Sequence, residues 1–338
     1  METIIMNITS IINNIEKVVK TPEIETGKYK RWLWQDEKQS RDLGINEYGC
    51  ADAANILYTV GYFPADPEER KEWVSTLQSL QNRETGLFQE PTHHFIHTTA
   101  HCSAALELFD AKPLYPCTAL QKYTQKENLY HLLEEEIDWS RPWGESHKGA
   151  GIFPSLNNTQ GMSLEWKNWY FDWLWENADP EIGFWDFGGG RTVANDRIME
   201  YMAGGFHYMF VCESEHRPYR YPEKMIDFCF KLLEDPATRK AYFCRICTFT
   251  EIDIVYAMNR ASRQTPYKFW EIKQCLETFA EEYLAMMENI DYMHDESFND
   301  LHMLFGAVCC LAELQAALPG KILTSKPLKL VLDRRPFI

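Results

Sequence analysis

The chain has 338 residues and a formal net charge of −16, from 34 Lys and Arg against 50 Asp and Glu. A surface this acidic repels phosphate backbones and anionic lipids, so the composition argues against nucleic acid and against membranes as partners. No stretch of 18 consecutive apolar residues occurs, which argues against a membrane-spanning helix. Hydrophobic residues make up 45% and aromatic residues 14% of the chain, enough for a large core and for aromatic surfaces that hold sugars or apolar ligands.

The first segment with a clear pattern covers residues 7–20. Its isoleucines and valines recur at helical spacing, which predicts an amphipathic helix that packs on a core. Glu2 stands where a targeting segment would carry basic residues, so a signal peptide is not expected.

Ten cysteines in a chain of this length do not indicate a disulfide framework. Most fall within helical patterns, which favours buried thiols in a reduced, cytoplasmic protein. One Cys-x-x-Cys pair, Cys244 and Cys247, lacks the second pair that a zinc site needs. We therefore expect neither a metal nor a cofactor.

An internal repeat dominates the sequence. Segments rich in Ala, Gly, Cys and aromatic residues, each followed by a proline, recur at intervals of about 50 residues with one gap twice as long. They cover residues 48–58, 97–108, 195–206, 250–258 and 298–311. A weaker copy at 145–156 fills the gap, although Gly149, Gly151 and Pro154 disfavour a helix there.

Conventional amphipathic helices are predicted between these segments. They cover residues 7–20, 68–82, 118–137, 163–177, 222–233 and 267–289. Six helices that are apolar almost all round must be buried on every side, and six half-exposed helices can cover them. The pattern therefore predicts an all-α, single-domain (α/α)6 barrel, or toroid, of six helical hairpins over residues 1–320. Residues 321–338 form a tail packed on it, with one short strand at 328–332.

Two stretches resemble the repeats of the terpenoid cyclase and protein prenyltransferase toroids. Residues 73–88 end an outer helix in Gln and continue into an acidic-Gly-x-aromatic turn, and residues 173–185 are a second version. The chain lacks the Asp-x-Asp-Asp acid motif of the cyclases and the Asp-x-Cys zinc motif of the prenyltransferases. The six-hairpin architecture is also similar to that of glycosidases, uronyl hydrolases, sugar epimerases and polysaccharide lyases, on the basis of fold alone.

In such a barrel the first turns of the inner helices open at one end, and titratable residues gather in those turns. The predicted catalytic residues are Asp52, His97, His101, Glu200, Asp253, Asp300 and His302. The predicted substrate-binding residues are Tyr48, Trp143, Glu145, His147, Trp185, Asp196, Arg197, Tyr201 and Glu251. Acidic residues are also favoured at helix N-termini by capping and by the helix dipole, which is the structural alternative for Asp196, Glu251 and Asp300.

Pairs of these groups suit acid–base chemistry on a sugar. Two carboxylates can act as general acid and general base in the hydrolysis of a glycosidic bond. A His–Tyr or His–carboxylate pair can instead transfer a proton at a sugar carbon, as in an epimerase or lyase. Gly188 to Gly190 suggest a mobile lid, and Arg191, Arg197 and Lys148 suggest an anionic substrate such as a uronic acid.

The sequence therefore predicts a carbohydrate-active enzyme, a hydrolase, lyase or epimerase, that acts on a small saccharide. Two alternatives stay open, a terpene- or prenyl-handling toroid and a non-catalytic binding or scaffold toroid. The sequence leaves open whether the protein forms a homo-oligomer.

Overall fold

The computed structural model describes residues 5–34, 44–187, 198–335 and 337–338, and it is all-α apart from four short strands. Contacts between Cα atoms divide the chain into two compact units. Unit 1 comprises Met1–Leu80, Tyr242–Val255 and Lys268–Val331, and unit 2 comprises Gln81–Ala241, Tyr256–Tyr267 and Leu332–Ile338. No helix in the described ranges is long and apolar enough to cross a membrane.

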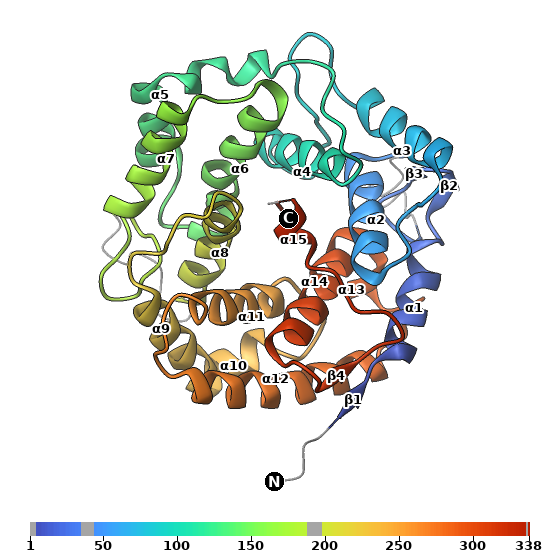
Figure 1. The fold of residues 1–338 in the computed structure, drawn as a ribbon, viewed down its shortest axis with the longest axis vertical. Coiled ribbons are helices and arrows are strands. Elements are labelled where there is room, and N and C mark those ends of the chain that lie inside the picture. Colours follow the sequence, from blue (N-terminus) through green and yellow to red (C-terminus); the bar gives the residue numbers. More distant parts are fainter. Residues whose placement is uncertain (1–4, 35–43, 188–197, 336) are drawn as a thin grey trace. The chain divides into compact units, whose positions relative to one another are not determined.

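Unit 1 is built around α2 (Glu47–Val60) and α14 (Leu301–Ala317), which pack against each other (Figure 1). Almost every residue of these two helices is buried. The helices α1 (Thr9–Val19) and α3 (Pro67–Ser79) pack on α2, and α12 (Phe269–Asn289) packs on α14, each through one apolar face. The short helix α13 (Glu296–Asn299) leads into α14.

Four short strands complete unit 1. The strand β1 (Met6–Asn7) pairs in parallel with β4 (Ile322–Leu323), and β2 (Glu23–Glu25) pairs antiparallel with β3 (Lys28–Tyr29). The β1–β4 pair joins the two ends of the unit's sequence, so residues 321–323 belong to its packed part.

Unit 2 is built around three consecutive buried helices, α4 (Phe95–Glu107), α6 (Pro142–Gln160) and α8 (Met199–Ser214). The helix α6 packs against both α4 and α8, and these are the closest helix pairs of the unit (Figure 1). Outside them lie the more exposed elements. These are η2 (Thr118–Thr124), α5 (Lys126–His131), η3 (Leu132–Glu136), α7 (Leu164–Glu176), α9 (Pro222–Glu234) and α10 (Pro236–Tyr242).

The chain passes between the units within α11 (Thr250–Ala261), whose residues are all buried. Val331–Arg334 forms a last short helix, α15. The predicted strand at 328–332 is therefore wrong, because its end is helical and the rest is irregular. The Leu, Lys and Val residues of 328–332 are typical of a strand, but no strand among the described residues pairs with this segment.

Two other predicted helices differ from the observed ones. The expected helix at 118–137 is divided into a 3-10 turn, a short α-helix and a π turn. The weak copy at 145–156 is instead part of a continuous 19-residue helix, α6, with Pro154 inside it. Its glycines permit close packing, since a β-carbon at Gly149 would lie 2.4 Å from the hydroxyl of Tyr208.

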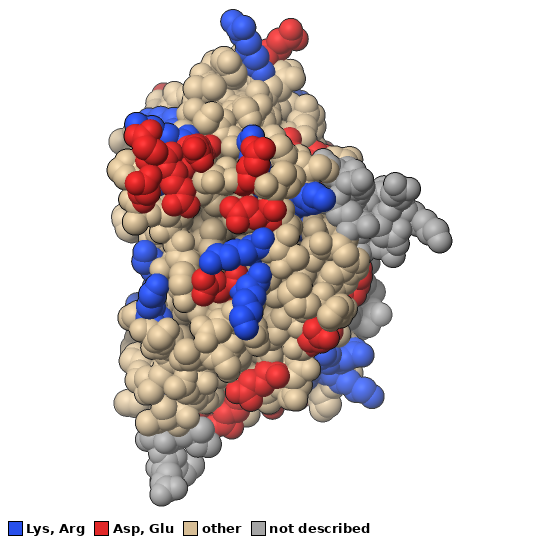
Figure 2. Space-filling model, turned by 90° about the vertical axis from the view of Figure 1, so that its right-hand side faces the viewer, with Lys and Arg blue, Asp and Glu red and all other residues tan. Residues whose placement is uncertain are grey.

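Charged side chains of both signs occupy the face drawn in Figure 2. Acidic side chains gather in one patch of that face, and basic side chains lie beside them and between other acidic ones. Charges of both signs are therefore interspersed on this face.

The packing of α8 against α6 gives a direct test of the core of unit 2. A β-carbon at Gly204 would lie 2.8 Å from the backbone carbonyl carbon and oxygen of Pro142, where backbone cannot move aside easily. We predict that Gly204→Ala lowers the free energy of unfolding by about 1–3 kcal/mol, the usual effect of overpacking. Urea denaturation measures it.

The control is Gly144→Ala in α6, because a β-carbon there would meet only the Arg141 guanidinium, at 3.8 Å. That variant should gain up to about 1 kcal/mol from helix propensity. Equal effects of the two substitutions would contradict the close α6–α8 contact.

Candidate functional site

A buried histidine–carboxylate pair lies between the two central helices of unit 1. Nδ1 of His302, in the first turn of α14, is 3.2 Å from each carboxylate oxygen of Asp52 on α2. Asp52 is fully buried and His302 is 5% exposed. The Tyr48 ring meets the imidazole edge-on with centroids 4.7 Å apart, and the Phe249 ring lies 4.8 Å from it. Asp52, Tyr48 and His302, all predicted site residues, are thus brought together.

Asp300 has a different part in the same region. Its carboxylate caps α14 by accepting the backbone N–H of His302 at 2.9 Å. It also binds the guanidinium of Arg31 through both oxygens, with N–O distances of 2.9 and 2.8 Å. Asp300 therefore fixes the backbone of His302 and binds Arg31. Its catalytic role stays a prediction.

Glu251 and Asp253 lie in the first turn of α11. Glu251 accepts hydrogen bonds from the backbone N–H of Cys244 at 3.0 Å and from the N–H and hydroxyl of Thr248. It thereby fixes the loop before α11, and burial nonetheless raises the pKa of its carboxyl. Asp253 is 1% exposed, and its Oδ2 has no hydrogen-bond partner among the described residues. Burial, together with the nearby Glu251, raises the pKa of Asp253 well above its usual range and so favours the protonated carboxyl.

The Cys-x-x-Cys pair belongs to the same loop. Cys247 is fully buried, and burial raises the pKa of its thiol well above the usual value. A thiol held in its protonated form is a poor nucleophile and a poor metal ligand. The environment of Cys247 therefore favours the structural interpretation of this pair.

Unit 2 contains a second concentration of titratable groups, which we call the histidine cluster. It consists of His93, His94, His97, His101, His147 and His207. The ring of His97 is central, with centroids 5.0 Å from His93, 5.2 Å from His147 and 6.4 Å from His101. The ring of His94 lies 6.2 Å from that of His147. The helices α4, α6 and α8 all contribute to the cluster, so three predicted residues, His97, His101 and His147, meet there.

Polar neighbours orient several of these rings. The carboxylate of Glu90 lies 3.1 Å from Nδ1 of His93, and the hydroxyl of Ser146 lies 2.8 Å from Nδ1 of His207. The guanidinium of Arg335 lies 3.2 Å from Nδ1 of His101. Because a guanidinium is always a donor, His101 accepts at Nδ1 and carries its proton on Nε2 when neutral.

Burial keeps part of the cluster uncharged. It lowers the pKa of His147 to about 2, and the neighbouring His207, His94 and Lys148 add to the effect. Burial and Lys148 also lower the pKa of His94. The Nε2 atom of His147 is buried without a hydrogen-bond partner among the described residues. A protonated imidazole at this position would leave a charge buried and unpaired.

The remaining predicted residues of unit 2 lie outside the histidine cluster or at its border. Glu145 forms a partly buried ion pair with Lys148 on α6, with a nitrogen–oxygen distance of 2.5 Å. Trp185 is buried and donates its indole N–H to the carbonyl of Leu174 at 2.7 Å, as a core residue does. The structure places Trp143 in the first turn of α6, and Glu200 and Tyr201 in the first turn of α8.

Part of the predicted site cannot be placed. Asp196 and Arg197, together with Arg191 and the Gly188 to Gly190 run, lie outside the described residues. The predicted lid and two of the three basic groups for an anionic substrate therefore stay predictions. The third, Lys148, is paired with Glu145.

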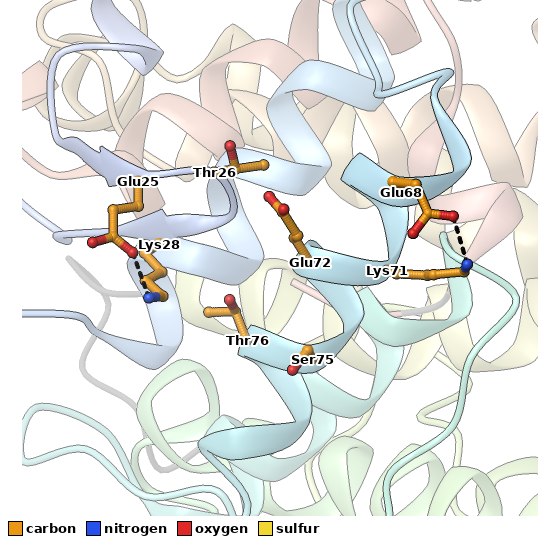
Figure 3. Close-up of a pocket in the computed structure, with 8 residues that line it drawn as sticks. All are labelled: Glu25, Thr26, Lys28, Glu68, Lys71, Glu72, Ser75 and Thr76. Carbon is orange, nitrogen blue, oxygen red and sulfur yellow. Dashed lines mark hydrogen bonds and ion pairs between the residues drawn. The ribbon is translucent and has the colours of Figure 1, made fainter.

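A surface groove of about 500 Å³ lies in unit 1 between the β2–β3 hairpin and α3 (Figure 3). Its walls carry two ion pairs, Glu25 with Lys28 at 2.5 Å and Glu68 with Lys71 at 2.6 Å. Thr26, Glu72, Ser75 and Thr76 complete the lining among the described residues. Exposed pairs of this kind contribute little energy, and none of the predicted site residues lines the groove.

Sequence reasoning missed Arg31 of unit 1 and His93, His94 and His207 of the cluster. The four-residue spacing of His97 and His101 places both on one face of α4. His93 and His94 stand just before that helix, where helical spacing does not apply. Arg31 and Asp300 are 269 residues apart, and no local pattern connects them.

No family model, no curated protein sequence and no solved structure matches this chain. Its function therefore has to be inferred from its own residues.

The lowered pKa of His147 predicts a loss of stability in acid. In the unfolded chain this histidine takes up a proton as the pH falls below about 6.5, while the folded state, with a pKa of about 2, does not. Folding is then penalised by up to about 1.4 kcal/mol per pH unit, and by about 1 kcal/mol between pH 6.5 and 5.5. Urea denaturation at several pH values should show this slope, reduced in His147→Gln.

The matched control is His294→Gln, because the side chain of His294 is 81% exposed. This variant should keep the pH dependence of the unmodified protein. A slope that His147→Gln leaves unchanged would mean that His147 is not held neutral by burial.

Proposed function

We propose that the two units together form an (α/α)6 toroid. The order of the helices along the chain supports it. The helices buried almost all round are α2, α4, α6, α8, α11 and α14, and the more exposed helices that precede or follow them are α1, α3, α5, α7, α9 and α12. Closing such hairpins into a ring is the arrangement that covers each buried helix without separate capping repeats.

Small-angle X-ray scattering tests this architecture. A closed toroid of 338 residues should have a radius of gyration of about 20 Å, the value for a compact domain of this length. An open superhelix or two units that move independently would give a larger radius and a longer maximum dimension, and either result would contradict the toroid.

We further propose that the protein is a carbohydrate-active enzyme that transfers a proton at a carbon atom of a small saccharide, as lyases and epimerases do. The observation that carries this proposal is the Asp52–His302 pair. A carboxylate that accepts from Nδ1–H fixes the tautomer of the imidazole and leaves Nε2 as the basic nitrogen. Asp52 would also stabilise the imidazolium that forms when Nε2 takes the proton.

The same pair favours proton transfer at carbon over hydrolysis. Hydrolysis of a glycosidic bond by two carboxylates requires them about 5–9.5 Å apart on either side of the bond. In unit 1 the carboxylate of Asp52 is instead engaged by an imidazole, and that of Asp300 by Arg31. Tyr48, beside the histidine ring, is fully buried and packs edge-on against the imidazole, so it supports the position of His302.

Deuterium exchange at substrate carbon tests the proposal directly. Uronic acids and neutral mono- and disaccharides are incubated with the enzyme in D₂O, and proton NMR measures the loss of each C–H signal. His302→Gln and Asp52→Asn should slow exchange by roughly 10²–10⁴-fold, the range for loss of a general acid–base group. Formation of a carbon–carbon double bond conjugated with the carboxylate, seen as a new short-wavelength ultraviolet absorbance, separates a lyase from an epimerase.

The controls come from an exposed copy of the same pair. Nδ1 of His294 lies 3.0 Å from a carboxylate oxygen of Asp291, with side chains 81% and 66% exposed. His294→Gln and Asp291→Asn should leave exchange unchanged. A thermal-shift panel of the same sugars with isoprenoid diphosphates sets the alternatives apart, since protection by diphosphates alone would overturn the carbohydrate proposal.

A further inference from the structure

The segment that precedes α2 in unit 1 holds the start of α14 in place through its backbone. Trp32 and Asp300 form an antiparallel β-bridge. The N–H of Leu33 donates to the carbonyl of Asn299 at 2.8 Å, and the N–H of Leu301 donates to the carbonyl of Arg31 at 2.9 Å. This short ladder fixes the register of Arg31 against the residues just before His302.

The side chain of Arg31 then reaches the candidate pair by two routes. One passes through Asp300, whose Oδ1 accepts both from Nε of Arg31 and from the backbone N–H of His302, each at 2.9 Å. The other passes through Tyr48, because the guanidinium lies 4.7 Å from the centre of its ring. The same ring also contacts the imidazole of His302, edge-on with centroids 4.7 Å apart.

Burial makes both routes rigid. Arg31 is 5% exposed and Tyr48 is fully buried. A bidentate guanidinium–carboxylate pair has a fixed plane, and stacking on an aromatic face fixes that plane a second time. Lysine carries the same charge but supplies neither the fork nor the flat face.

We infer that Arg31 is the positioning residue of the Asp52–His302 pair. Through Asp300 it fixes the backbone that carries His302, and through Tyr48 it fixes the plane of the imidazole against Asp52. The consequence for chemistry rests on the proposed function, but the geometric role does not.

The test measures the tautomer of His302 directly. Two-bond ¹H–¹⁵N spectra of ¹⁵N-histidine-labelled protein report the tautomer of each imidazole, and the His302→Gln spectrum identifies the His302 signal by difference. The unmodified protein should show His302 protonated on Nδ1, toward Asp52. Arg31→Lys should give a mixture of tautomers or a broadened signal for His302, because the ring is no longer held in one plane.

Arg70→Lys is the matched control. Arg70 also lies over an aromatic ring of unit 1, that of Phe63 at 5.1 Å, and its substitution should leave the His302 signal unchanged. Addition of free guanidinium to Arg31→Ala at non-denaturing concentration should restore the single tautomer. If Arg31→Ala does not fold, Arg31→Lys alone decides.

A lower melting temperature of Arg31→Lys with an unchanged His302 signal would overturn the inference and leave Arg31 a purely structural residue. With a substrate found by deuterium exchange, Arg31→Lys should lower kcat about tenfold or more with little change in KM, as expected for misplacement of a catalytic group. No exchange with any sugar would refute the proposed function while the spectrum still decides the role of Arg31.

Discussion

Burial of polar side chains on helices that are apolar almost all round is the constraint on which the rest of this structure depends. A carboxylate or an imidazole on such a helix has no access to bulk water, so it must find a partner on another helix or lose its charge. Asp52 and His302 take the first course. Burial raises the pKa of Asp253 and lowers the pKa of His147, which in each case favours the neutral form.

The two clusters of titratable groups differ in this respect. In unit 1 two carboxylates lie near His302: Asp52 is within hydrogen-bond distance of the ring, and Asp300 caps α14 and binds Arg31. In the histidine cluster of unit 2 imidazoles face other imidazoles, and the carboxylate of Glu90 lies within hydrogen-bond distance of His93. Burial and the neighbouring imidazoles lower the pKa of His147, and burial together with Lys148 lowers the pKa of His94, so these two rings favour the neutral form.

Close packing explains why weak helix formers appear in the central helices. Gly149, Gly151 and Gly204 cost helix propensity. A β-carbon at Gly149 or Gly204 would overlap a neighbour at 2.4 or 2.8 Å, and one at Gly151 would be tight at 3.1 Å from Ile96. The ring of Phe337 is one such neighbour, since it lies near Gly151 and meets His97 edge-on at 5.0 Å. Glycines that lower the stability of an isolated helix thus allow the close packing of helices within the unit.

The sequence by itself determined the all-α class, the alternation of buried and half-exposed helices, and most helix positions to within a few residues. These properties are local, since apolar spacing and capping residues such as Asn46, Asp66 and Ser163 act within one or two helical turns. It also placed His97 and His101 on one face. Only the tertiary structure decided that Asp52 meets His302, 250 residues away, and that Arg31 meets Asp300. A contact between distant segments depends on how helices pack, and the spacing of residues along the chain carries no record of it.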